Sequence, residues 1–267
     1  MLETMVDIAK SAGQEILAIY ETADFGVEMK ADDSPLTRAD LAAHHVIVNA
    51  LGEKFPEIPV LSEESTALDY AVRQQWQRYF LVDPLDGTKE FIARNGEFTV
   101  NIALIDHEVP VLGVVHVPVT GVTYSGDVDG QTAIKESSEG RSEIAARGVD
   151  HNAGGALMVV GSRRHGSEAL DALVSRLRTR FDAVQLTSMG SSLKLCLVAE
   201  GKADFYPRLA PTCEWDTAAA HAVVLASGGT VLDEQFEPLR YNTKAELLNP
   251  NFFVIGDTPE IWKELLS

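Results

Sequence analysis

The segment from Leu81 to Phe91 constrains the fold of this chain more than any other part of the sequence. It reads Leu-Val-Asp-Pro-Leu-Asp-Gly-Thr-Lys-Glu-Phe, an apolar run that leads directly into two aspartates, a proline and a glycine, and then into a helical start. An apolar run that ends at Pro and Gly predicts a buried strand closed by a tight turn. The segment therefore predicts a strand, a turn and a helix, with Asp83 and Asp86 crowded at the end of the strand.

These two aspartates can be interpreted in two ways. Carboxylates this close together repel each other unless a proton or a cation lies between them, and Mg²⁺ prefers such oxygen ligands. Gly87 lets the backbone approach a ligand, and the amides of Gly87 and Thr88 at a helix start favour a phosphate group. The alternative is an Asp-Pro turn followed by an aspartate that caps the helix, which needs no ligand. The segment alone leaves both interpretations open.

Two other acidic segments carry the same ambiguity. Glu63 and Glu64 directly follow the apolar pair Val60-Leu61, and Asp216 begins a helix of small residues within Glu214–His221. Alone, a Glu-Glu pair is typical of a solvated loop, and Asp216 is typical of a helix N-cap. Together with the first segment, they would supply several carboxylates at the ends of strands and helices.

The charge balance restricts the partners of the chain. Lysine and arginine number 22 and aspartate and glutamate 40 in 267 residues, so the net charge is 22 − 40 = −18. Such a surface repels polyanions, so we expect no nucleic-acid partner. A small phosphorylated substrate would need metal ions or basic groups to reverse the potential at one site. The sequence has no basic leader, no uninterrupted apolar span and no CxxC pair, which predicts a reduced, cytoplasmic protein without a transmembrane segment.

Hydrophobic periodicity organises the first half of the chain. Apolar residues at steps of three and four predict helices over 2–21 and from Leu41 to Phe55, the second capped by Thr37 with Asp40 in its first turn. Strands are predicted over 80–82, 98–105, 111–117 and 123–124, in a mainly antiparallel sheet. The polar stretch 126–155 is expected to be a surface excursion or a domain junction, with the domain boundary near His151.

Beyond that boundary, strands and helices alternate, which predicts α/β layering. The expected strands are 157–160, 183–186, 204–206, 230–232 and 252–255, and the expected helices are 168–178, 192–200 and 216–227. We therefore expect an N-terminal α+β subdomain over 1–150 that carries the acidic motifs. A C-terminal α/β subdomain over 151–267 would follow, with a cleft between the two.

Taken together, the three acidic segments resemble the inositol monophosphatase superfamily of metal-dependent, lithium-sensitive phosphatases. The motifs of that superfamily read (G/S)EE, DPxDGT and WDxAA in this order, and here they are Ser62–Glu64, Asp83–Thr88 and Trp215–Ala219. The resemblance implies a layered αβαβα sandwich of the inositol monophosphatase/fructose-1,6-bisphosphatase type, with the active site between two subdomains. It also implies two or more Mg²⁺ ions in each active site.

The same resemblance implies a role for each motif residue. Glu63, Asp83 and the carbonyl of Leu85 would bind one Mg²⁺, and Asp83, Asp86 and Asp216 would bind a second. Thr88, oriented by Asp40, would take up the proton of the attacking water, which would approach phosphorus in line with the ester oxygen.

Three segments narrow the resemblance to the 3′(2′),5′-bisphosphate nucleotidases of the bacterial CysQ type. They are Lys30–Asp40, Thr88–Phe91 and Gly190–Lys194. Inositol monophosphatases usually have Thr-Thr-Asn-Phe at the second of these. The implied reaction removes the 3′-phosphate of adenosine 3′,5′-bisphosphate to give AMP and phosphate, in connection with sulfate assimilation, with some activity on 3′-phosphoadenylyl sulfate.

The resemblance also implies a set of residues that contact the substrate. They are Glu63, Asp86, Gly87, Thr88, Lys89, Ser162, His165, Ser191, Lys194, Arg208 and Asp216. Three of them have local alternatives, since Arg208 could pair with a surface acid, His165 could cap the next helix, and Lys194 could be solvated.

Two rival functions stay open from the sequence. One is an inositol monophosphatase, and the other is a non-catalytic metal-binding scaffold that keeps only the fold. Intact Thr88 and Asp40 argue against the scaffold, because metal binding alone needs neither. The resemblance further implies a monomer that acts on a small nucleotide, and it leaves peripheral association with the cytoplasmic face of the inner membrane open.

Overall fold

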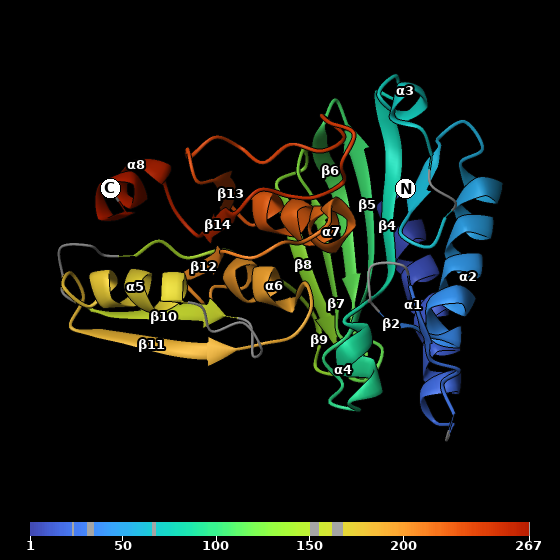
Figure 1. Cartoon of the computed structure of the whole chain (residues 1–267), viewed down its shortest axis with the longest axis horizontal. Helices are drawn as coiled ribbons and strands as arrows, with labels where there is room; N and C mark the ends of the chain where they lie inside the picture. The colour runs from blue at the N-terminus through green and yellow to red at the C-terminus, as the bar shows by residue number, and fades with distance from the viewer. Residues whose placement is uncertain (23, 31–34, 66–67, 150–154, 162–167, 267) are drawn as a thin grey trace.

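A seven-stranded sheet is the largest sheet of the structure, a computed structural model that describes residues 1–22, 24–30, 35–65, 68–149, 155–161 and 168–266 (Figure 1). In spatial order its strands are β3 (Val60–Ser62), β4 (Arg78–Asp86), β5 (Thr99–Asp106), β6 (Val109–His116), β7 (Thr123–Asp127), β8 (Thr132–Ser137) and β9 (Gly140–Glu143). Strands β3 and β4 pair in parallel and the other neighbours pair antiparallel. The predicted mainly antiparallel sheet is confirmed.

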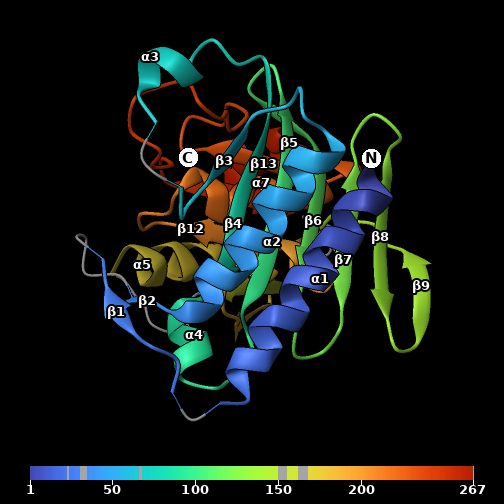
Figure 2. The ribbon, with the colours of Figure 1, turned by 90° about the vertical axis from the view of Figure 1, so that its right-hand side faces the viewer.

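Two long helices, α1 (Leu2–Tyr20) and α2 (Arg38–Lys54), lie side by side across one face of this sheet (Figure 2). The predicted cap of α2 is present, because the amide and hydroxyl of Thr37 donate to Oδ2 of Asp40 at 2.7 and 2.5 Å. Short elements complete this half of the chain. They are β1 (Glu28–Met29), β2 (Pro35–Leu36), α3 (Tyr70–Arg73) and α4 (Thr88–Ile92).

A second, five-stranded sheet is built from the second half of the chain. Its spatial order is β11 (Ala183–Ser188), β10 (Ala156–Gly161), β12 (Phe205–Arg208), β14 (Phe252–Ile255) and β13 (Thr230–Asp233). The helices of this half are α5 (Glu168–Leu177), α6 (Leu193–Ala199), α7 (Glu214–Ala226) and α8 (Pro259–Leu266). Strand β10 pairs in parallel with β11 and β12, and the other pairs are antiparallel. The predicted alternation of strands and helices is confirmed.

Alternating side chains show that each sheet is covered on both faces. In β4, Tyr79 and Leu81 pack into the central core with α6 and α7, whereas Phe80 and Val82 pack into the outer core with α1 and α2. The strands of the second sheet alternate in the same way, between the central core and a third core that contains Trp262 of α8. Because side chains alternate with a period of two along a strand, this pattern fixes five layers in the order αβαβα.

Helix α7 packs against the first sheet through residues without bulky side chains. A Cβ added at Gly113 of β6 would lie 2.1 Å from the carbonyl oxygen of Ala219, and one at Gly126 of β7 would lie 2.7 Å from the Cα of Val223. Glycine is therefore needed at both positions for the backbones to approach this closely. The contact fixes the start of α7, which carries Asp216, against the sheet.

One sequence prediction is wrong, because 126–155 is not a surface excursion throughout. Its first part forms the end of β7 and then β8 and β9, which extend the sheet, and the turn between β7 and β8 is closed by the Gly130 amide donating to Asp127 Oδ1 at 2.9 Å. His151, the proposed boundary, lies outside the described residues. In the described ranges, none of the helices is apolar and long enough to cross a membrane.

Candidate active site

The turn after β4 is shaped by its own aspartates. The pairing of β4 with β5 shifts register between Asp83 and Asp86, so the end of the strand departs from regular pleating. Oδ1 of Asp83 accepts a hydrogen bond from the amide of Leu85 at 3.0 Å, which holds the Asp-Pro turn in place. Gly87 then adopts φ +95°, a conformation that favours glycine, and α4 begins at Thr88.

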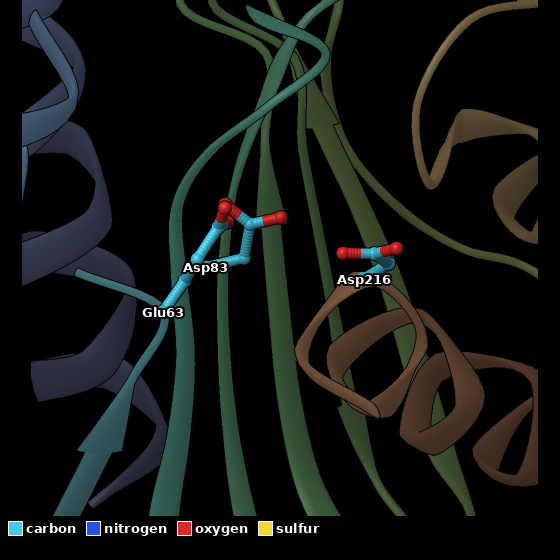
Figure 3. Close-up of side chains that lie close together, drawn as sticks. All are labelled: Glu63, Asp83 and Asp216. Atoms are coloured by element: carbon cyan, nitrogen blue, oxygen red, sulfur yellow. The ribbon is translucent and has the colours of Figure 1, made fainter. Parts of the chain in front are cut away.

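Three carboxylates from distant segments meet at this turn. Glu63 follows β3, Asp83 lies in β4 and Asp216 lies in the first turn of α7, and one carboxylate oxygen of each lies within 4.8 Å of the other two. Figure 3 shows Glu63 and Asp83 on one side of the gap and Asp216 facing them from its helix. The structure thus brings together three of the four side chains that the sequence predicted as metal ligands.

The charges in this group are poorly balanced by protein cations. Burial, and then repulsion from Glu63 and Asp86, raises the pKa of Asp83 well above its usual value. Burial, and then repulsion from Asp86, does the same for the pKa of Asp216. Lys30 pairs with Glu63 at 2.7 Å, but burial still raises the pKa of Glu63. Oxygen ligands with this excess of negative charge fit a hard divalent cation.

The fourth predicted ligand, Asp86, has its own set of partners. Its Oδ2 accepts hydrogen bonds from the backbone amide of Ser192 at 2.5 Å and from the side-chain amide of Asn101 at 3.4 Å. Burial raises its pKa, although Lys194 acts in the opposite direction. Asp86 lies outside the group of three but lines the same cavity as Asp216.

Thr88 and Asp40 are in direct contact, as the sequence predicted. The Thr88 hydroxyl lies 3.3 Å from Oδ1 of Asp40 and 3.5 Å from the carbonyl oxygen of Leu85. The other oxygen of Asp40 is held by Thr37, and burial raises the pKa of Asp40. Asp40 therefore both completes the capping box of α2 and is a fixed acceptor for the Thr88 hydroxyl.

A cavity of about 180 Å³ opens beside the acidic group. The predicted substrate-binding residues that line it are Asp86, Gly87, Lys89, Ser191, Lys194, Arg208 and Asp216. Ser162 and His165 lie outside the described residues. The cavity therefore combines carboxylates from both halves of the chain, Asp86 and Asp216, with cationic side chains that come mainly from the second half.

The local alternatives for the cations do not hold in the structure. Lys194 is not solvated, because its side chain is buried with Nζ 2.5 Å from the carbonyl oxygen of Ser191. Burial lowers its pKa to about 8, although Asp86 acts in the opposite direction. Arg208 donates to the carbonyls of Ala210 and Pro211, and no surface acid pairs with it in the described part of the chain.

Sequence reasoning gave no role to Lys30, Asn101 or Ser192, all of which contact the predicted metal ligands. Asn101 carried a signal, because a polar residue inside the apolar strand β5 needs a buried partner. For Ser192 the sequence carried no comparable signal, since serine at a helix start is a common cap.

Comparison with known proteins agrees with this geometry. A model of the inositol monophosphatase family matches residues 1–266. The 3′(2′),5′-bisphosphate nucleotidase CysQ of Escherichia coli (strain K12) is 51% identical over 255 residues, covering 95% of this chain and 99% of that protein. The crystal structure of CysQ from Bacteroides thetaiotaomicron superposes with a TM-score of 0.84 at 46% identity, covering 96% and 97% of the two chains. The suhB protein of Bartonella henselae has the same fold, with a TM-score of 0.77 at 24% identity over 99% and 97% of the chains.

Proposed function

The chain belongs to the inositol monophosphatase family, and from this premise we propose that it is a metal-dependent 3′(2′),5′-bisphosphate nucleotidase. It hydrolyses the 3′-phosphate of adenosine 3′,5′-bisphosphate to give AMP and phosphate. We extend the proposal to 3′-phosphoadenylyl sulfate as a second substrate, and to a cytoplasmic, monomeric enzyme that clears a by-product of sulfate assimilation. Relatives at 51% identity, named 3′(2′),5′-bisphosphate nucleotidase, support the assignment of the reaction.

One observation carries the proposal from the structure. The cavity that contains Asp86 and Asp216 also contains Lys194 and Arg208. A substrate with a single phosphate would use the metal-ligating carboxylates and leave these cations unpaired. A substrate with two separate anionic groups uses both ends of the cavity, because guanidinium and ammonium groups bind phosphate.

The donor set fits Mg²⁺. Glu63, Asp83 and the carbonyl of Leu85 would hold one ion, and Asp83, Asp86 and Asp216 would hold a second. The raised pKa values of Asp83 and Asp216 come from burial and mutual repulsion, which a bound divalent cation relieves. Once bound, such ions would stabilise negative charge on the phosphoryl group and increase the acidity of water.

Thr88 and Asp40 supply the proton path of the reaction. The Thr88 hydroxyl donates to Oδ1 of Asp40, which leaves a lone pair on the Thr88 oxygen for the attacking water. As that oxygen takes a proton from the water, the original hydroxyl proton of Thr88 would pass to Oδ1 of Asp40. Thr37 holds the other oxygen of Asp40, so the orientation of the Thr88 hydroxyl is set before the substrate binds. Positioned proton transfer of this kind contributes about 10²- to 10⁴-fold to a rate.

The groups around Lys194 and Arg208 would hold the remote end of the substrate. The 5′-phosphate would pair with these two cations, while Lys89 and Ser191 line the same cavity. We include Ser162 and His165 in this contact set from the family resemblance. Because binding energy from a remote group can orient the reacting one, loss of the 5′-phosphate should lower kcat as well as the affinity.

A phosphate-release assay across four substrates tests this function. With Mg²⁺ present, adenosine 3′,5′-bisphosphate should have a much higher kcat/KM than inositol 1-phosphate, fructose 1,6-bisphosphate or 5′-AMP. A preference for inositol 1-phosphate would assign the chain to the inositol monophosphatases instead. No release of phosphate from any of the four would favour the non-catalytic scaffold.

A further inference from the structure

The turn between β11 and α6 packs against the segment that leads into β5 of the first sheet. The amide of Gly190 donates to Oε2 of Glu97 at 2.8 Å, and a Cβ added at Gly190 would lie 2.8 Å from the Glu97 carbonyl oxygen. Ser191 adopts φ +47°, which is uncommon for a residue other than glycine and tends to occur at functional sites. The next residue, Ser192, is thereby placed with its amide directed at Asp86.

Ser192 also takes part in a directed chain of side-chain hydrogen bonds. Its hydroxyl donates to Oδ1 of Asn101 at 2.9 Å, so the contact of 2.9 Å with the Thr99 hydroxyl must use Thr99 as the donor. The remaining polar group of Asn101, its NH₂, lies 3.4 Å from Oδ2 of Asp86. The chain therefore runs from Thr99 through Ser192 and Asn101 to the carboxylate of Asp86.

Water does not compete for these groups. Thr99, Asn101 and Ser192 are 0%, 1% and 2% exposed. A buried polar group that loses its partner is destabilised, so each member of the chain keeps the next in one orientation. In particular, the hydroxyl of Ser192 fixes which end of the Asn101 amide faces Asp86, and a carboxylate oxygen requires the NH₂ end.

We propose that Ser192 is a positioning residue for Asp86, acting by its amide directly and by its hydroxyl through Asn101. This inference rests on the proposed function, because it takes Asp86 as a metal ligand. Ser192 belongs to the second half of the chain and Asp86 to the first, so the turn that lines the substrate cavity also orients a metal ligand. Partners that orient a ligand in this way typically change metal affinity or activity about 10- to 100-fold when they are removed.

Metal affinity measured without substrate tests the inference. Mg²⁺ binding to the full chain is followed by titration calorimetry, and the Tm in EDTA is recorded for each variant. Ser192→Ala should weaken Mg²⁺ binding by about tenfold or more, with a fall in kcat. The matched control is Thr123→Ala, which removes another buried hydroxyl of the first sheet, bonded to Nδ1 of His116 at 2.9 Å away from the acidic group. It should lower the Tm without changing Mg²⁺ affinity.

A double-mutant cycle tests the route through Asn101. If the Ser192 hydroxyl acts through Asn101, Ser192→Ala should have little further effect on Mg²⁺ affinity in an Asn101→Ala background. Full additivity of the two changes would overturn that route, and so would equal weakening of Mg²⁺ binding by Thr123→Ala. If Ser192→Ala does not fold, Ser192→Cys keeps a weak donor and should give an intermediate affinity, whereas wild-type affinity in Ser192→Cys would overturn the inference.

Asp86→Asn separates this inference from the function on which it rests. If Asp86→Asn weakens Mg²⁺ binding but Ser192→Ala does not, the positioning role fails and the metal site stands. If Asp86→Asn itself binds Mg²⁺ like the wild type, the assignment of Asp86 as a ligand fails, and the positioning role fails with it.

Discussion

Replacing Asp83 by Asn should stabilise the metal-free protein while it abolishes activity. Asp83 is 1% exposed, and its pKa is raised well above the usual value by burial and then by repulsion from Glu63, Asp86 and Asp216. Asparagine keeps nearly the same shape and can still accept the Leu85 amide through its Oδ1, as Asp83 does at 3.0 Å. The substitution therefore removes the repulsion and little else.

The structure gives the size of this effect. One carboxylate oxygen of each residue in the group lies within 4.8 Å of the other two. Two unit charges at that distance repel each other by about 3.5 kcal/mol at an effective dielectric constant of about 20. The carboxyl avoids part of that repulsion by holding a proton, so we expect a gain of about 2 kcal/mol in the metal-free protein. For a protein of this size the corresponding rise in Tm is about 4 to 8 °C.

The pH dependence has a definite sign. The folded protein holds the Asp83 proton more tightly than the unfolded chain does, because the pKa is raised. The stability that this proton uptake contributes is therefore fully present below the pKa of Asp83 in the unfolded chain. It is lost as pH rises through the pKa of Asp83 in the folded protein. Metal-free wild type should become less stable over that range, and Asp83→Asn should depend less on pH.

Thermal and urea unfolding in EDTA and in saturating Mg²⁺ measure the effect. In EDTA the variant should be the more stable protein. In Mg²⁺ the order should reverse, since a ligand at 100 times its Kd stabilises the wild type by about 2.7 kcal/mol and the variant binds Mg²⁺ weakly. A variant that is less stable than wild type in EDTA would refute the argument from charge repulsion.

Thr88→Val keeps the shape of the side chain but removes its hydroxyl, so kcat should fall by about 10² to 10⁴; a steady-state kcat close to that of wild type would leave Thr88 with only a structural role. Burial lowers the pKa of Lys194 to about 8, so its ammonium group loses a proton as pH rises through that value and the KM for the bisphosphate should rise. Lys194→Met should raise KM and make it depend less on pH. A KM that depends on pH as in the wild type would contradict the role of Lys194 in binding the 5′-phosphate. Gly113→Ala should lower the Tm, because the added Cβ would lie 2.1 Å from the carbonyl oxygen of Ala219 and overpacking typically costs about 1 to 3 kcal/mol. Its control in the same unfolding experiment is Gly52→Ala, where nothing lies within 4 Å of the added Cβ, and equal Tm values for the two variants would contradict the tight packing of α7.

Local features of the fold could be predicted because their causes lie within a few residues. The cap of α2 by Thr37 and Asp40 needs only residues three apart, and the turn after Asp83 follows from its Pro and Gly. Strands β8 and β9 were missed because they are the last two strands at one end of the sheet. Their residues are half-buried or exposed in all but one position, so the sequence shows no apolar alternation there.

The parts of the site that depend on tertiary contacts could not be predicted in the same way. The burial of Lys194, which lowers its pKa, results from the packing of α6 against β12. There Nζ of Lys194 lies 5.6 Å from the centroid of the Tyr206 ring. The bond from Ser192 to Asp86 joins the two halves of the chain, and a serine before a helix predicts only a cap. The predicted metal ligands could be named from the sequence because their motifs resemble those of a known family.

The identity of the phosphate that is released tests the central claim most directly. Adenosine 3′,5′-bisphosphate is incubated with the enzyme and Mg²⁺, and the products are followed by ³¹P nuclear magnetic resonance and by chromatography against standards. We expect 5′-AMP and inorganic phosphate, because Lys194 and Arg208 would hold the 5′-phosphate while the 3′-phosphate would lie at the carboxylate group. Formation of 3′-AMP as the first product would contradict it.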